Sequence, residues 1–160
     1  MAIVVSDTSP IAALAHVGQL DLLPRLFQIV LIPPAVAAEL ASPSMAIKPL
    51  TPVELPFVEV RMPANLERVA RLREQLDNGE SQAIALAIEL SAALLIDEAI
   101  GRRVATEHGI QITGALGVLV RGKKIGAVSA VAPLLLQLER GLDFYMSNSL
   151  KAAVLRAAGE

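Results

Sequence analysis

The chain has 160 residues, no cysteine and a formal net charge of −2. Without cysteine, disulfides, thiolate catalysis and cysteine-ligated zinc are excluded. The weak negative charge excludes a polycation that coats nucleic acid, and an aromatic content of 2% leaves few side chains on which bases can stack. Apolar runs stay shorter than the roughly 18 residues of a membrane-spanning helix. We therefore expect one cytoplasmic domain over residues 1–160, with no membrane partner.

The first part of the chain alternates apolar runs with helical segments. Residues 2–6 are rich in β-branched side chains, which predicts a buried strand. A helix is expected next, with Thr8 or Ser9 as its cap. Residues 28–32 predict a second strand, and the proline pair at 33–34 ends it and opens another helix.

The middle of the chain begins with an expected loop over residues 42–56, which hold four prolines. We expect a short edge strand at 58–60 and an amphipathic helix at 66–76. The motif DNGESQAIALAIEL predicts a turn and then a long helix, with Asn78 as its cap. Residues 92–96 predict a third core strand.

The alternation continues to the end of the chain. We expect a helix at 98–108, a strand at 110–113 and a helix at 114–124. Two further helical segments follow, and Ser147 is expected to cap the last one. Strands that alternate with helices indicate an α/β fold in which a mostly parallel sheet of four to five strands is covered by helices on both faces.

Acidic side chains interrupt the apolar context at several points. Asp7 and Asp97 each directly follow a predicted strand, and ligands of open α/β sheets bind outside the carboxyl ends of the strands. Both are therefore expected to point into one crevice. Glu39, Glu80 and Glu98 lie in or next to predicted helices, where capping or the helix dipole also explains an acid. That simpler explanation is weakest for Glu39, which falls in the second helical turn.

A shared crevice changes the electrostatics of these acids. Two carboxylates about 4 Å apart repel by roughly 4 kcal/mol at an effective dielectric of 20. Three or four of them persist together only if a proton or a cation neutralises them. Oxygen-only ligands select Mg²⁺ or Mn²⁺, which can activate water and clamp a phosphodiester. The residues alone thus predict a metal-binding acidic crevice and do not establish a nuclease.

Five segments resemble, in order and spacing, the PIN-domain family, specifically its small bacterial and archaeal toxin-like branch near the VapC toxins. They are VVSDTSPIAALAHVGQLDLL, LIPPAVAAEL, LDNGESQAIALAIE, LLIDEAIGRRVATEHGIQITGALGVLVRGKKIG and GLDFYMSNSLKAAVLRAAGE. The resemblance covers most of the chain apart from residues 42–61. It implies a PIN-like three-layer α/β fold and a nuclease with an acidic Mg²⁺ or Mn²⁺ site, and many members of the family act on RNA.

The resemblance also implies roles for individual acids. Asp7 and Asp97 resemble the metal-binding acids after the first and third core strands of the family. Glu39 resembles the Glu on the helix after the second strand, and Glu80 stands where many members carry Asp. These four are the implied catalytic residues and metal ligands. The branch often has a second Asp after the third strand, so Glu98 is a departure, and whether it replaces that ligand stays open.

Other polar side chains each have two explanations. Ser9 could orient a metal-bound water, or cap a helix. Arg102 could contact phosphate or hold an active-site carboxylate, or form a helical ion pair with Glu98 one turn earlier. Lys123 could touch RNA phosphate, or complement the dipole at a helix end. Tyr145, the only tyrosine, is expected to pack rather than to stack on a base.

The leading hypothesis is a divalent-metal-dependent endoribonuclease, the toxin half of a toxin–antitoxin pair, with RNA as substrate and an antitoxin protein as partner. The competing hypothesis is a catalytically inactive binding module that keeps the PIN fold, and divalent-metal binding distinguishes the two. A receiver-type phosphoacceptor is disfavoured because receivers place an acidic pair after the first strand, where this chain has only Asp7. The apolar content of 54% and the resemblance together predict a homodimer.

Overall fold

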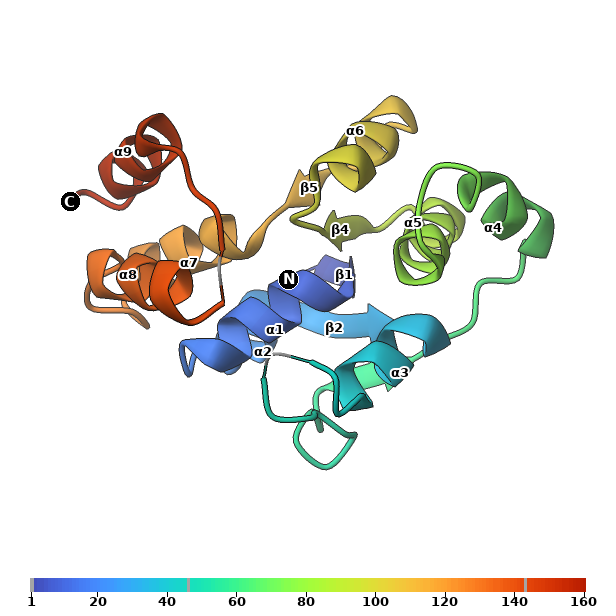
Figure 1. Ribbon diagram of the computed structural model, residues 1–160, viewed down its shortest axis with the longest axis horizontal. Helices are drawn as coiled ribbons and strands as arrows, with labels where there is room; N and C mark the ends of the chain where they lie inside the picture. Colours follow the sequence, from blue (N-terminus) through green and yellow to red (C-terminus); the bar gives the residue numbers. More distant parts are fainter. Residues whose placement is uncertain (1, 46, 143) are drawn as a thin grey trace.

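The computed structural model describes residues 2–45, 47–142 and 144–160, and at its centre lies a five-stranded parallel sheet (Figure 1). The strand order is β3-β2-β1-β4-β5, so the first strand of the chain is the central one. The predicted α/β fold with a parallel sheet is confirmed, including the short edge strand β3. The strands are β1 (Ala2–Ser6), β2 (Phe27–Ile32), β3 (Val58–Val60), β4 (Ala93–Leu95) and β5 (Ile112–Thr113).

Helices cover both faces of this sheet, which makes three layers (Figure 1). Within the described ranges they are α1 (Thr8–His16), α2 (Leu22–Leu26), α3 (Pro34–Ala41), α4 (Leu66–Leu72), α5 (Asn78–Leu90), α6 (Ala99–Glu107), α7 (Ala115–Lys124), α8 (Ala132–Gly141) and α9 (Asn148–Ala157).

The side chains of the central strands alternate between two apolar cores, as the pleat of a strand requires. Val4 of β1 packs in the core that includes α1, α2, α7 and α8, whereas Val5 packs in the core formed with α4, α5 and α6. In β4, Leu95 joins the first core and Leu94 the second. These near-continuous apolar strands are typical of a parallel sheet buried on both faces.

Helix α5 organises the carboxyl end of the sheet. Its residues from Gly79 to Ala87 are all buried. The side-chain oxygen of Gln82 accepts a hydrogen bond of 3.0 Å from the backbone N–H of Ala35, in the first turn of α3. This bond ties the start of α3 to α5, and the two helices carry Glu39 and Glu80.

The helix caps differ in part from those predicted. Asp7 is the N-cap residue of α1 in place of the hydroxyl residues that follow it, and Asp77 replaces Asn78 as the N-cap residue of α5. The Asp77 carboxylate accepts a hydrogen bond of 2.8 Å from the backbone N–H of Glu80. Ser147 caps α9, as predicted, by accepting a bond from the third residue of that helix. Two helices at the carboxyl end of the sheet thus begin on an acid.

Helix α4 is shorter than predicted. It ends at Leu72, and the predicted residues up to 76 form a turn that leads into α5. None of the helices in the described ranges is both long and apolar enough to span a membrane.

The burial of α5 generates a stability prediction. Leu86 is completely buried, whereas Leu90 on the same helix is 37% exposed. We expect Leu86→Ala to lower the free energy of unfolding by about 2–5 kcal/mol, because it leaves a cavity in the core. Leu90→Ala is the matched control and should cost less than about 1 kcal/mol. Urea unfolding measures both, and equal losses would contradict the packing of α5.

Candidate functional site

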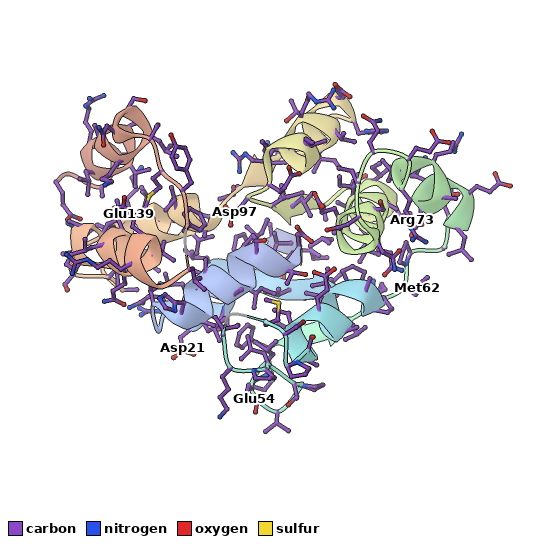
Figure 2. All side chains as sticks on the ribbon, viewed as in Figure 1. Asp21, Glu54, Met62, Arg73, Asp97 and Glu139 are labelled. Atoms are coloured by element: carbon purple, nitrogen blue, oxygen red, sulfur yellow. The ribbon has the colours of Figure 1, made fainter. Side chains whose placement is uncertain are left out.

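Two acids follow neighbouring strands at the carboxyl end of the sheet. Asp7 comes directly after β1, and Asp97 comes two residues after β4. These strands pair in parallel, with Ser6 opposite Leu95. The backbone N–H of Asp7 donates to the carbonyl of Leu95 at 2.9 Å, which keeps the two segments joined where the acids begin. In Figure 2 the labelled Asp97 lies at the inner end of the opening between α6 and α9.

Asp7 lies in the middle of a group of acids. It is only 4% exposed, and burial raises the pKa of Asp7 to about 7. The nearby N–H of Thr8 opposes this shift in pKa, but the charges of Asp77, Glu39 and Asp97 add to it. Each of these three carboxylates is therefore close enough to Asp7 to repel its charge.

Glu39 projects from α3 toward the starts of α1 and α5. Its Oε2 atom accepts a hydrogen bond of 2.7 Å from the hydroxyl of Thr8. A Cβ atom on Gly79 would lie 2.6 Å from its Oε1 atom. The first turn of α5 therefore has room for this carboxylate because residue 79 has no side chain.

Glu80 is the most perturbed of the acids. It is 8% exposed, and its Oε2 atom has no hydrogen-bond partner among the described residues. Burial raises the pKa of Glu80 to about 9. Asp77 and Glu98 contribute to this rise in pKa, because their carboxylates accept a hydrogen bond only from the protonated form of Glu80. The negative charge of Asp7 raises the pKa further. Glu80 therefore holds a proton at neutral pH when no cation is bound.

Asp97 is fixed through one of its two oxygen atoms. Oδ1 accepts a hydrogen bond of 2.9 Å from the backbone N–H of Ala115, whereas Oδ2 is buried without a partner among the described residues. Burial raises the pKa of Asp97, although the Ala115 N–H and the charge of Arg102 act against this. Arg102 is anchored beside it by a bond of 2.7 Å from Nη1 to the carbonyl of Ile96.

Glu98 serves as the N-cap of α6. Its two oxygens accept bonds of 3.0 Å and 2.7 Å from the backbone N–H groups of Ile100 and Gly101. Desolvation acts to raise the pKa of Glu98, but these N–H groups outweigh it and hold the pKa below its usual value. The capping explanation for Glu98 is therefore confirmed.

Four helices begin at this group of acids. Asp7, Asp77 and Glu98 are the N-cap residues of α1, α5 and α6, and Asp97 accepts a bond from the first residue of α7. A helix N-terminus carries partial positive charge and unpaired N–H groups, which stabilise nearby carboxylates. The fold thus offsets part of the repulsion with backbone dipoles.

A cavity of about 810 Å³ opens beside Asp97. One side of the cavity is polar and is lined by Ser9, Asp97, Glu98 and Arg102. The other side is lined by apolar side chains from α7, from α9 and from the residues before α9. This volume lies within the range of about 300–1,000 Å³ that small-molecule sites occupy. The acids therefore border a space in which a ligand can lie.

A family model described as PIN domain matches residues 3–160, which is nearly the whole chain. The chain belongs to the PIN-domain family. None of the curated proteins matches it. PIN domains are generally nucleases and typically use divalent metals. The parallel α/β fold of this PIN domain agrees with that family.

The PIN domain brings together the four acids that its sequence singled out, Asp7, Glu39, Glu80 and Asp97. Their roles as catalytic residues and metal ligands stay predictions. Of the two explanations for Arg102, the ion pair with Glu98 is not the one the structure shows, because each group is bonded to the backbone instead.

The remaining predicted side chains lie in different places. Ser9 is the exposed second residue of α1 and lines the cavity rather than capping the helix. Lys123 lies eight residues beyond the start of α7, about 12 Å along the helix, and pairs with Glu160 at 3.0 Å. The structure therefore does not bring Lys123 to the acids. Tyr145 is 86% exposed, so the expectation that it packs is wrong.

Two residues that contact the predicted acids were not predicted from the sequence to belong to the site. Asp77 is three positions before Glu80, and this D-x-x-E spacing is the pattern of a capping box, which would have identified it. Thr8 supports Glu39 from another element. Nothing in the local sequence pairs these two residues, because they meet only when α1 and α3 pack together.

A divalent cation such as Mg²⁺ requires several oxygen donors around one point. In the described part of the chain, no three His, Asp or Glu side chains stand as one group able to hold an ion. Glu39, Asp77 and Glu98 are instead engaged by protein donors. The oxygen-only donors, with Glu80 Oε2 and Asp97 Oδ2 buried and without partners, nevertheless suit a hard cation. The residues thus fit such an ion by their chemistry, and binding requires their side chains to move closer together.

The raised pKa values predict how stability depends on pH. Folded Glu80, and folded Asp7 below about pH 7, retain protons that the unfolded chain releases near pH 4. In EDTA, the free energy of unfolding should therefore fall as pH rises from about 4, the unfolded pKa, to about 9, the folded pKa of Glu80. Each group contributes at most about 1.4 kcal/mol per pH unit within its window. Thermal unfolding at a series of pH values measures this slope.

A neutral substitution separates Glu80 from the other groups. Glu80→Gln should raise the midpoint at pH 8 in EDTA and flatten the slope, because the costly ionisation is removed. Glu74→Gln, at an exposed position just before the same helix, is the control and should leave the slope unchanged. An unaltered slope in Glu80→Gln would show that this carboxyl group does not carry the pH dependence.

Proposed function

We propose that this PIN domain is a divalent-metal-dependent endoribonuclease. The observation that carries the proposal is the group of mutually repelling carboxylates at the carboxyl end of the sheet, two of whose oxygens are buried without partners. Such a group is unstable unless protons or a cation neutralise it. The membership in the PIN-domain family supports the same conclusion.

Asp7, Glu39, Glu80 and Asp97 would hold Mg²⁺ or Mn²⁺, and Asp77 is positioned to assist them through its charge. Glu98 has a smaller part in this proposal, because both of its oxygens already serve α6. The bound ion would supply an activated water and would offset negative charge on the phosphodiester.

The chain's own residues prepare the site in defined ways. Glu80 carries a proton at neutral pH before loading, so its carboxyl group releases that proton when a cation takes its place. Thr8 orients Glu39 by donating to Oε2, and Ala115 orients Asp97 by donating to Oδ1. Arg102 places a positive charge beside Asp97, where the phosphate of a substrate would lie.

The finer parts of the proposal concern the biological setting. They are RNA as the substrate, a role as the toxin of a toxin–antitoxin pair, an antitoxin protein that covers the crevice, a homodimer and a cytoplasmic location. The resemblance of the five sequence segments to the toxin-like branch of the family supports them. The apolar content of 54% supports the homodimer in addition.

Metal binding is the first test, because it needs no knowledge of the RNA. Titration with Mn²⁺ should raise the thermal midpoint of the wild-type chain. At an Mn²⁺ concentration 100 times the dissociation constant, the free energy of unfolding should rise by about 2.7 kcal/mol. Asp7→Asn and Asp97→Asn should lose this increment. Asp21→Asn is the control, since Asp21 is exposed and lies before α2, away from the acids (Figure 2). An equal increment in all variants would contradict a shared site.

Cleavage is the second test. Incubation of the chain with total cellular RNA and Mn²⁺ should produce discrete fragments, and EDTA should abolish them. Asp7→Asn and Asp97→Asn should lower the rate by about 100-fold or more, because each removes a ligand of the cation that would stabilise the negatively charged transition state. Fragment ends are mapped by sequencing. Metal binding without cleavage of any RNA would favour the inactive binding module instead.

A further inference from the structure

The cavity beside Asp97 has two chemically distinct sides. Its polar side carries Ser9, Asp97, Arg102 and Thr113. Its apolar side is formed by Leu116 of α7, by Leu150 and Val154 of α9, and by Leu142, Phe144 and Tyr145 between α8 and α9. The cavity is lined by residues of α6, β5, α7 and α9, and Figure 1 shows α6 and α9 on either side of β5 and α7. A ligand that fits it has one polar edge and one broad apolar face.

Glycines keep the polar side of the cavity open. A Cβ atom on Gly114 would run into Oδ1 of Asp97 and lie 3.1 Å from Nη1 of Arg102. A Cβ atom on Gly117 would lie 2.8 Å from the Thr113 side chain. Both glycines line the cavity, so the side chains of Asp97 and Arg102 keep their positions against bare backbone.

Tyr145 is presented to this cavity by its neighbours. Met146 is buried, Phe144 is packed in part against the core, and Tyr145 between them is 86% exposed. Because both of its neighbours are held in the core, Tyr145 stays at the surface between them. Among the four aromatic residues of the chain, Phe144 and Tyr145 both line the cavity.

We propose that this cavity holds one nucleotide of single-stranded RNA next to the cleaved bond, with its base stacked on Tyr145. The inference rests on the proposed function, because it assumes a phosphodiester at the acids. Asp97 belongs to the cavity wall, so the nucleotide attached to a phosphate there lies in or at the mouth of the cavity. An exposed aromatic ring offers the face on which an unpaired base stacks.

The polar side of the cavity suits the edge of that nucleotide. Ser9 and Thr113 carry hydroxyl groups that both donate and accept hydrogen bonds. Arg102 uses Nη1 to hold the carbonyl of Ile96, and its guanidinium has further N–H donors. A base edge or a ribose hydroxyl can bond to these groups while the base covers the apolar side.

The chain provides its own reporter for this test, because Tyr145 is the only tyrosine and there is no tryptophan. We would titrate single-stranded hexa-adenylate into the Asp7→Asn chain and record tyrosine fluorescence. This background removes one negative charge and, by the proposed function, does not cleave. Stacking should quench the signal to saturation, and N-acetyltyrosinamide under the same conditions corrects for absorption by adenine.

Matched variants in the same background locate the binding. Tyr145→Ala should weaken the binding of a fluorescently labelled hexa-adenylate about 10-fold, measured by anisotropy, because one stacked base is lost. Tyr145→Phe keeps a ring and should stay within about 2-fold of the parent. Val53→Ala changes an equally exposed apolar residue in the 42–56 loop and should have no effect. Circular dichroism verifies that each variant is folded.

The outcomes separate this inference from the proposed function. Equal affinity in Tyr145→Ala and its parent, or no quenching, would overturn the subsite even if the wild-type chain cleaves RNA. Saturable quenching that is lost in Tyr145→Ala would support the subsite even if no cleavage is found. A tyrosine fluorescence per molecule that changes with protein concentration, in the absence of RNA, would mean that a second copy of the chain covers the cavity. That result would also overturn the subsite.

Discussion

The structure is organised around the crowding of like charges at the carboxyl end of its sheet. Asp7, Asp97, Glu39, Asp77 and Glu80 are held close enough for their charges to interact. Coulomb repulsion among them would separate the elements that carry them, unless the fold opposes it. Three features oppose this repulsion: a retained proton on Glu80, the N-termini of four helices, and the apolar packing that holds these elements in place.

That packing shows why the site and the core are parts of one arrangement. Gln82 ties α3 to α5 by its bond to Ala35, and the same two helices present Glu39 and Glu80. Gly79 lets the Glu39 carboxylate lie against the first turn of α5. The resulting group of carboxylates, whose repulsion is only partly offset, is suited to a cation, and beside it lies the cavity lined by Tyr145, which has one polar and one apolar side. In the function proposed here, metal, phosphate and base each meet one part of this edge.

Much of the fold could be predicted from local patterns. The β-branched run before Asp7 and the apolar run before Asp97 predicted two strands of a parallel sheet, and therefore two acids at one edge. The errors have physical causes. Asn78 and Asp77 are both good caps, and the spacing to Glu80 favours the acid. Tyr145 was expected to pack, but its burial depends on which of its neighbours reach the core, and Phe144 and Met146 do so instead.

The sequence by itself determined the α/β class, the chain order of the elements and the acids at strand ends, because hydrophobic periodicity and helix caps act over a few residues. Only the tertiary structure decided which acids meet, that Thr8 bonds Glu39, that Lys123 pairs with Glu160, and that Tyr145 lines a cavity with Asp97. These relations join residues far apart in the chain. They depend on how helices pack on the sheet, and no local pattern contains that information.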